Sequence, residues 1–427
     1  MKYNTYTLDN GLRIIHLPSD SQVVYCGYQI NAGTRDEMPG EEGLAHFCEH
    51  VTFKGTSRRK AWHILNCLES VGGDLNAYTN KEGTVYYAAI LKEHIARAVD
   101  LLSDIVFHSV YPQQEIDKEV EVICDEIESY NDSPAELIYD EFENILFKGH
   151  PLGHNILGTA EQVRKFTTED ALRFTRKLYR PDNAIFFAYG DIDFKKLVAL
   201  LKKNNLSEER RVKSEETTFG DRRESQFYCT DGDSQKASFD SQSSAGKTIV
   251  VEKNTHQAHV MIGTRAYDVH DDRRMPLYLL NNILGGPGMN AKLNLALREH
   301  NGLVYTVEST MVAYGDTGTW SIYFGCDEHD VKRCLRLVRK ELDKFMQKPL
   351  SDAQLRAAKK QIKGQIGVAC DNRENFALDF GKSFLHYGWE KNVDRLYEQV
   401  DAITAQQIQA VAEELFDENR LTTLIFK

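Results

Sequence analysis

Two histidines and a glutamate lie close together in a segment that is otherwise mostly apolar. His46, Glu49 and His50 fall in the stretch GLAHFCEHVTFKGT. If this stretch is helical, His46 and His50 are one turn apart and project from one face, where two imidazoles can bind one cation. Glu49 lies on the same side and could take a proton from water held by that cation. The order H-x-x-E-H reverses the commoner H-E-x-x-H zinc motif and is typical of inverzincins. The motif alone leaves open the alternative of two structural histidines on one helix face.

A catalytic zinc takes three protein ligands, so a third ligand is expected elsewhere in the chain. The segment EIDKEVEVICDEIESY has the periodicity of an amphipathic helix, with Ile116, Ile123 and Ile127 on its apolar side. Glu119 and Glu126 fall on that same side, where a carboxylate without a partner would be costly. We infer that these glutamates face the histidines. The alternative is a pair at the helix edge that reaches water.

The elements that must position these residues occur twice along the chain. The strands GLRIIHLPS and VVYCGYQINAG precede the motif, and a helix ending in Gly-Gly and the strands DLNAYTN and GTVYYAAIL follow it. Further helices and a strand NAIFFAYGDI close the first half. The second half repeats this order from KTIVVEK to LTTLIF without an H-x-x-E-H motif. The sequence therefore predicts an α+β fold of two homologous domains, each a mainly antiparallel sheet packed with helices.

A polar stretch separates the two halves. It is rich in Ser, Asp and charged residues and poor in aliphatic ones, as linkers are. We expect a zinc-binding domain over residues 1–205, a linker over 206–246 and the second domain over 247–427.

The composition excludes several classes of protein. Of 427 residues, 41% are hydrophobic and 27% charged, which is globular usage and not disorder. The net charge of −12 argues against a nucleic-acid or anionic-membrane partner. The opening residues do not read as a signal peptide, and no apolar run is long enough to span a membrane. The eight cysteines are scattered without a CxxC pair, so we expect a cytoplasmic protein with free thiols.

The segment NAGTRDEMPGEEGLAHFCEHVTFKGT resembles the active-site segment of the M16 metallopeptidases, the family of pitrilysin, insulin-degrading enzyme and the mitochondrial processing peptidases. That family combines H-x-x-E-H with a downstream glutamate. Glu126 stands in ICDEI, 76 residues after His50, a spacing similar to the family's. The stretches GGDLNAYTNKEGTVYY, HPLGHNILGT and YRPDNAIFFAYGDID extend the resemblance over nearly the whole chain.

The resemblance implies a role for each residue of the first half. His46, His50 and Glu126 would bind one Zn²⁺ per chain, and Glu49 would act as the general base. Glu119 matches the family's additional carboxylate, which supports the ligands without binding the metal.

The resemblance also implies where a substrate binds. Asn76 and Ala77 would hold peptide backbone that joins a free sheet edge as an added β-strand. We also place Phe47 among the substrate-binding residues. In the second half, Arg298 and Tyr305 of LREHNGLVYTVES match a pair that contacts the substrate near the scissile carbonyl from the opposite half. Without the resemblance, these two residues indicate only a surface ion pair and a strand tyrosine.

The length of the chain resembles that of the two-domain members of the family, in which two chains close one chamber. Because this chain has both the zinc motif and the arginine–tyrosine pair, we expect a homodimer, with a heterodimer with a related chain as the alternative. The stretch LGGPGMNAKL resembles the glycine-rich loop of processing-peptidase partners, although a helix followed by a turn fits it equally well. The expected function is a zinc-dependent endopeptidase for short or unfolded peptides in an enclosed chamber. The alternative is a non-catalytic subunit or scaffold of a peptidase pair.

Overall fold

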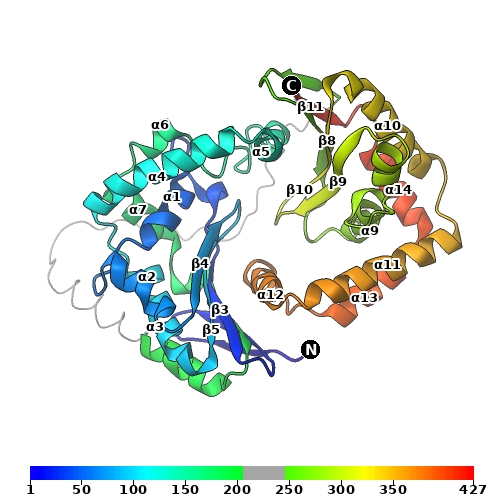
Figure 1. The fold of residues 1–427 in the computed structure, drawn as a ribbon. Coiled ribbons are helices and arrows are strands. Elements are labelled where there is room, and N and C mark those ends of the chain that lie inside the picture. The colour runs from blue at the N-terminus through cyan, green and yellow to red at the C-terminus, as the bar shows by residue number, and fades with distance from the viewer. Residues whose placement is uncertain (205–245) are drawn as a thin grey trace, which may run out of the picture.

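The computed structural model describes residues 1–204 and 246–427, which form two β-sheets covered by helices (Figure 1). The expected linker lies outside the described residues, apart from Gly246. In the described ranges, no helix is long and apolar enough to cross a membrane. The predicted α+β class is confirmed.

The first sheet has the strand order β1-β2-β6-β3-β5-β4. Its neighbouring strands are antiparallel except for β2 and β6, which are parallel. The strands are β1 (Asn4–Thr7), β2 (Arg13–Pro18), β3 (Val23–Ile30), β4 (Asp74–Thr79), β5 (Thr84–Leu91) and β6 (Ala184–Gly190). Among the described strands, β4 pairs only with β5, so one edge of β4 is open.

The helices of the first half bury most of their apolar residues in one core with one face of this sheet. They are α1 (Leu44–Thr52), α2 (Ala61–Glu69), α3 (Ile95–His108), α4 (Gln113–Asn131), α5 (Pro134–Leu146), α6 (Ala160–Val163) and α7 (Thr168–Leu178). Helix α5 is the exception, because its buried residues belong to a different core.

The second sheet has the order β7-β11-β8-β10-β9, with only β7 and β11 parallel. Its strands are β7 (Thr248–Val251), β8 (Ala258–Ala266), β9 (Val304–Ala313), β10 (Gly318–Cys326) and β11 (Thr422–Phe426). The helices are α9 (Arg274–Gly285), α10 (Val331–Gln347), α11 (Asp352–Cys370), α12 (Arg373–Tyr387), α13 (Val393–Ala402) and α14 (Ala405–Leu415). The edge strand β9 corresponds in position to β4.

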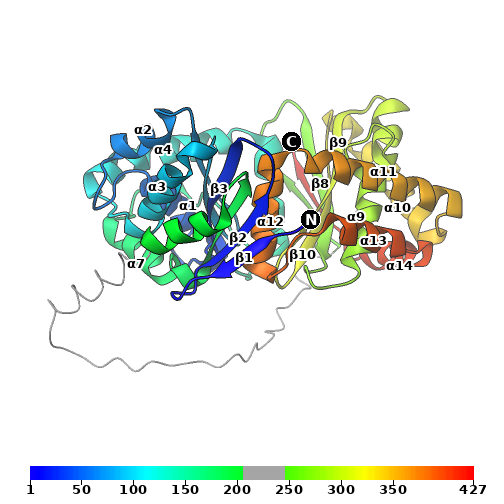
Figure 2. The same ribbon diagram turned by 90° about the horizontal axis from the view of Figure 1, so that it is seen from below.

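The two halves exchange a helix. Helix α5 of the first half packs on the second sheet, where Phe142 shares a core with Met261 and Tyr323. Helix α12 of the second half packs on the first sheet, where Phe380 shares a core with Phe187. Figures 1 and 2 show α12 between the strands of the first sheet and the rest of the second half. Burial of each such aromatic ring stabilises the contact by roughly 1.5–3 kcal/mol, so the exchange ties the halves together.

Candidate metal centre

Helix α1 carries the three residues of the motif, and α4 lies against it with the two glutamates. Helix α1 begins after Gly43, whose φ of 96° is in the left-handed region that favours glycine. Its other face is anchored in the first core by buried apolar side chains: Leu44, Ala45, Phe47, Cys48 and Val51. Helix α4 is anchored there by Ile116, Val120, Ile123 and Ile127. The histidines therefore face the carboxylates on a rigid support.

The structure brings His46, His50 and Glu126 together. The Nε2 atom of His50 lies 3.3 Å from Oε2 of Glu126, and Nε2 of His46 lies 3.8 Å from its Oε1. The candidate ligand atoms of all three residues lie within 4.8 Å of one another. Donors arranged tetrahedrally at about 2.1 Å from one zinc are about 3.4 Å apart, so these separations fit that ion. Two imidazoles and one carboxylate are also a common ligand set of catalytic zinc, with the fourth position open to water or substrate.

The protonation behaviour of the histidines is consistent with a site that attracts a cation. Burial and the neighbouring His50 lower the pKa of His46 to about 4, so its imidazole is neutral and able to donate a lone pair. Burial also acts to lower the pKa of His50, but the hydrogen bonds to Glu119 and Glu126 outweigh it and raise the pKa to about 9. The hydrogen bond with His50 in turn holds the pKa of Glu126 below its ordinary value. The carboxylates thus place a strong negative field where the two imidazoles meet.

Glu119 fixes the orientation of His50. Its Oε1 accepts a hydrogen bond from Nδ1 of His50 at 3.0 Å, and its Oε2 pairs with Nζ of Lys54 at 2.5 Å. Burial raises the pKa of Glu119, but the bonds to His50 and Lys54 more than offset this and lower it. With Nδ1 engaged in this way, Nε2 of His50 is turned toward Glu126, as is typical of histidines that bind metals. Lys54 was missed in the sequence. Its position four residues after His50 could have indicated that it lies on the same side of the helix.

Glu49 lies between the metal-ligand candidates and strand β4. Its Oε2 accepts a hydrogen bond of 2.7 Å from the hydroxyl of Thr79, the last residue of β4. Burial raises the pKa of Glu49, and the bond from Thr79 only partly opposes this shift. Thr79 was also missed in the sequence, although it belongs to the NAYTN stretch. A carboxylate with a raised pKa beside a candidate metal position is suited to accepting and returning a proton.

The residues predicted to bind a substrate do not all fit that role. Asn76 is exposed and Ala77 half-buried on β4, where they pair with Tyr87 and Tyr86 of β5 and leave the opposite edge open. The side chain of Phe47 is fully buried and packs against Phe166, with ring centroids 5.2 Å apart. The assignment of Phe47 to the substrate-binding residues is therefore wrong, because its side chain offers no surface to a peptide.

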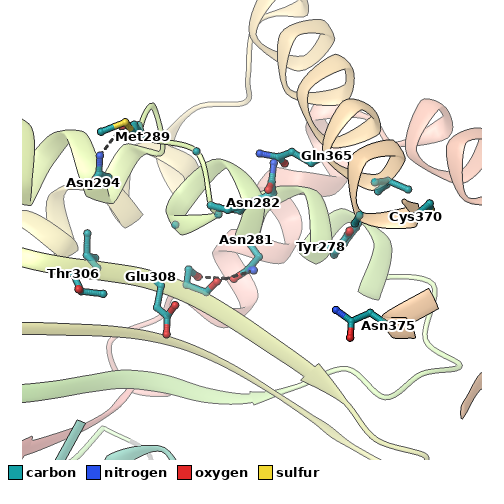
Figure 3. A pocket seen from close by; sticks show the side chains of 18 of the residues that line it. Tyr278, Asn281, Asn282, Met289, Asn294, Thr306, Glu308, Gln365, Cys370 and Asn375 are labelled. Carbon is teal, nitrogen blue, oxygen red and sulfur yellow. Dashed lines mark hydrogen bonds between the residues drawn. The ribbon is translucent and has the colours of Figure 1, made fainter. Parts of the chain in front are cut away.

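Arg298 and Tyr305 lie apart from the metal-ligand candidates, in the second half. The guanidinium of Arg298 lies over the ring of Tyr305, 5.4 Å from its centroid, and Tyr305 is 80% exposed. Both line a cavity of about 870 Å³ beside the open edge of β9 and the glycine-rich loop at 285–288. Figure 3 shows other parts of its lining, including Asn281, Asn282 and Glu308. The lining of this cavity includes none of His46, Glu49, His50 and Glu126.

The fold and the donor set define a duplicated α+β protein with a candidate metal centre at the H-x-x-E-H motif of its first half. Residues 14–160 match the family described as Insulinase (Peptidase family M16), and residues 165–362 match the Peptidase M16 inactive domain. The chain belongs to peptidase family M16.

Its relatives carry names that agree with this assignment. The chain is 31% identical to an uncharacterized zinc protease of Bacillus subtilis, over 98% of this chain and 97% of that protein. It is also 31% identical to an uncharacterized zinc protease of Streptomyces coelicolor, over 96% and 86% of the two chains. Among solved structures, a protease from Helicobacter pylori superposes with a TM-score of 0.86 at 22% identity, over 100% and 99% of the chains. The structure of a peptidase M16 inactive domain from Pseudomonas fluorescens superposes with a TM-score of 0.84 at 16% identity, over 100% of this chain and 98% of that chain. At these identities, the two solved structures support the fold alone.

Proposed function

We propose that this chain is a zinc-dependent endopeptidase that hydrolyses short or unfolded peptides. The observation that carries the proposal is the convergence of His46, His50 and Glu126 beside Glu49 and the open edge of β4. The names of the relatives support a zinc protease, and the donor set supports zinc as the metal.

In the proposed mechanism, His46, His50 and Glu126 hold one Zn²⁺, which supplies Lewis acidity and lowers the pKa of water. The open edge of β4 aligns an extended peptide by main-chain hydrogen bonds, with Asn76 and Ala77 in the strand that pairs with it. Such pairing tolerates many side chains, which suits unfolded substrates.

Glu49 is the proposed proton carrier. Because Thr79 engages Oε2, the other carboxylate oxygen is left to accept the proton of the attacking water. The same proton then passes from Glu49 to the nitrogen of the scissile bond, so the amine leaves in neutral form. The raised pKa of Glu49 favours this transfer because the carboxyl group can hold the proton between the two steps.

We further propose that two copies of the chain form a closed chamber. Tyr305 is exposed and Arg298 stacks on its ring, so both side chains are accessible to a second copy of the chain. We propose that they reach the metal site of that copy. A tyrosine hydroxyl delivered by the partner could donate to the oxygen of the scissile carbonyl as negative charge develops on it. A chain with Glu49→Gln mixed with a chain with Tyr305→Phe would then recover activity, since a mixed dimer contains one complete site. Solution mass would show the dimer, and the absence of recovery would contradict an exchange of residues.

The direct test of the proposed function is zinc content and peptide hydrolysis by the purified chain alone, with a library of quenched fluorescent peptides. We expect one zinc per chain, cleavage that a chelator abolishes, and recovery when zinc is restored. A chain that binds zinc but cleaves nothing in the library would support the alternative of a non-catalytic subunit of a peptidase pair.

A further inference from the structure

The first turn of the metal-binding helix is capped by a side chain from outside the helix. The N-cap position of α1 is Gly43, which has no side chain to accept the N–H groups left free at a helix start. Glu37 supplies the missing acceptor: its Oε2 accepts from the backbone N–H of Gly43 at 3.1 Å and its Oε1 from that of Ala45 at 2.7 Å. The Glu37 carboxylate is completely buried. A negative charge at this place is also favoured by the helix dipole.

A second side chain holds the same carboxylate from the opposite direction. Nε2 of His154 lies 2.9 Å from Oε2 of Glu37 and 3.1 Å from the carbonyl oxygen of Thr34. His154 belongs to the connection between α5 and α6, and its own carbonyl accepts a hydrogen bond from the Lys81 ammonium. The start of α1 is therefore tied to a loop more than one hundred residues further along the chain.

The same loop also touches the backbone of the helix start. A Cβ atom added to Gly43 would lie only 2.7 Å from the carbonyl oxygen of Leu157 and 2.9 Å from Cα of Gly158. Residue 43 must therefore be glycine both for its left-handed φ and for this close approach. Glu37 on one side and the 154–158 loop on the other leave the first turn of α1 little freedom to move.

Glu37 holds the part of α1 that carries His46, so it affects the geometry of the candidate metal centre. Ala45, whose N–H is held by Glu37, directly precedes His46. A shift of this turn would move the His46 imidazole relative to Glu126, which lies on the separate helix α4. Burial of a carboxylate is costly unless it is fully paired, and burial does raise the pKa of Glu37 against the lowering effect of His154 and the two amides. The buried Glu37 carboxylate is stable only while it keeps these partners, so it holds the first turn of α1 in one position.

We propose that Glu37, held by His154, is a positioning residue of the metal centre that fixes His46 opposite Glu126. This inference rests on the proposed function, because it assumes that zinc binds between these residues. Glu37 does not touch the metal, the substrate or the reacting atoms. It acts through the backbone of α1.

The test is Glu37→Gln, with zinc affinity measured by competition against a chromophoric chelator. Glutamine keeps the length of the side chain but has only one acceptor oxygen, so one helix amide loses its partner and the charge is lost. We expect zinc affinity to fall by about tenfold or more, the effect typical of removing a group that orients metal ligands. In peptide hydrolysis we expect kcat to fall with KM nearly unchanged, because the β4 edge is not altered.

A matched control and a milder variant complete the test. Glu42→Gln changes a neighbouring carboxylate that accepts from Gly40 and contacts Gln162 rather than α1, and we expect wild-type zinc affinity and kinetics. His154→Gln leaves the hydrogen bonds from the N–H groups of Gly43 and Ala45 to Glu37 in place, so we expect a smaller loss of zinc affinity. This variant carries the test if circular dichroism shows that Glu37→Gln does not fold.

Two results would overturn the inference. The first is unchanged zinc affinity in the folded variants. The second is a loss of affinity that disappears once it is corrected for the folded fraction, which would show a purely structural role. A wild-type chain that binds no zinc would instead contradict the proposed function, from which this inference starts.

Discussion

At the scale of single residues, the sequence predicts which side chains share a helix face, but it does not predict contacts between distant elements. The helical period predicted that His46 and His50 share one helix face and that Glu119 and Glu126 share another. The family resemblance implied that the two pairs meet, and the structure brings all four residues together. Contacts that depend on how separate elements pack could not be placed in this way. Glu37 and His154 are 117 positions apart, and no periodicity relates them. The same reason explains why Thr79 was missed as a partner of Glu49, since they lie on a strand and a helix.

The bond between Glu119 and His50 leads to a prediction about metal affinity. In Glu119→Gln the side chain can still accept from Nδ1 of His50, but it no longer offsets the positive charge of Lys54 beside it. We expect zinc affinity to fall by about 10- to 100-fold. The control is Glu121→Gln on the same helix, where the exposed carboxylate pairs with Arg164. Equal affinities for the two variants, measured by chelator competition, would contradict the orienting role.

At the scale of elements, the sequence predicted most strands and helices in the right order, but the helices it did not predict include α5 and α12, the two that the halves exchange. The sequence shows α11 as a helix, yet α12 follows it after only Asp371 and Asn372, with no glycine or proline to mark the break. Residues 373–387 were therefore not predicted as a separate helix. That α12 is buried on the first sheet depends on tertiary packing over more than 180 residues of sequence separation, as between Phe187 and Phe380.

The packing of α12 predicts a large loss of stability when its central ring is removed. Phe380 is fully buried and contacts the rings of Tyr3, Phe187 and Tyr189 of the first half. We expect Phe380→Ala to lower the free energy of unfolding by about 3–5 kcal/mol. The control Arg373→Ala, at an exposed position at the start of the same helix, should change it by less than about 0.5 kcal/mol. Urea denaturation measures both, and similar values for the two variants would contradict the described packing.

At the scale of the whole molecule, the turn between β9 and β10 links the second half to the segment that precedes α1. Arg35 pairs with Glu82 of the first half and with Asp316 of this turn, each at 2.7 Å. Asp316 also lies 3.4 Å from Nε2 of His150. Arg35 is two residues from Glu37, so the contact between the halves lies close to the side chain that caps helix α1. The two halves are therefore connected near the start of α1 as well as through α5 and α12.

This contact predicts a dependence of stability on pH. The hydrogen bond with His150 and the pair with Arg35 hold the pKa of Asp316 well below its ordinary value in the folded protein. Its stabilising effect is therefore present in full above the ordinary aspartate pKa of about 4 and is lost as the pH falls below it. Because this carboxylate is about half exposed, we expect Asp316→Asn to cost no more than about 1 kcal/mol at pH 7.

The measurement is the free energy of unfolding of Asp316→Asn and of wild type at neutral and acid pH. The difference between the two proteins should shrink once Asp316 is protonated in both states. Asp9→Asn, which changes an exposed carboxylate in the turn between β1 and β2, is the control and should show no such trend. A difference for Asp316→Asn that is the same at both pH values would contradict the ion pair.

The central claim is that Glu49 carries the proton in a zinc-dependent peptide hydrolysis. The measurement that tests it most directly is zinc content together with peptide cleavage for Glu49→Gln. Glutamine keeps the shape of the side chain and leaves His46, His50 and Glu126 unchanged, but it cannot accept the proton of the attacking water. The account predicts one zinc per chain, as in wild type, and cleavage reduced by at least about 10²-fold. Undiminished turnover by a variant that retains its zinc would contradict it.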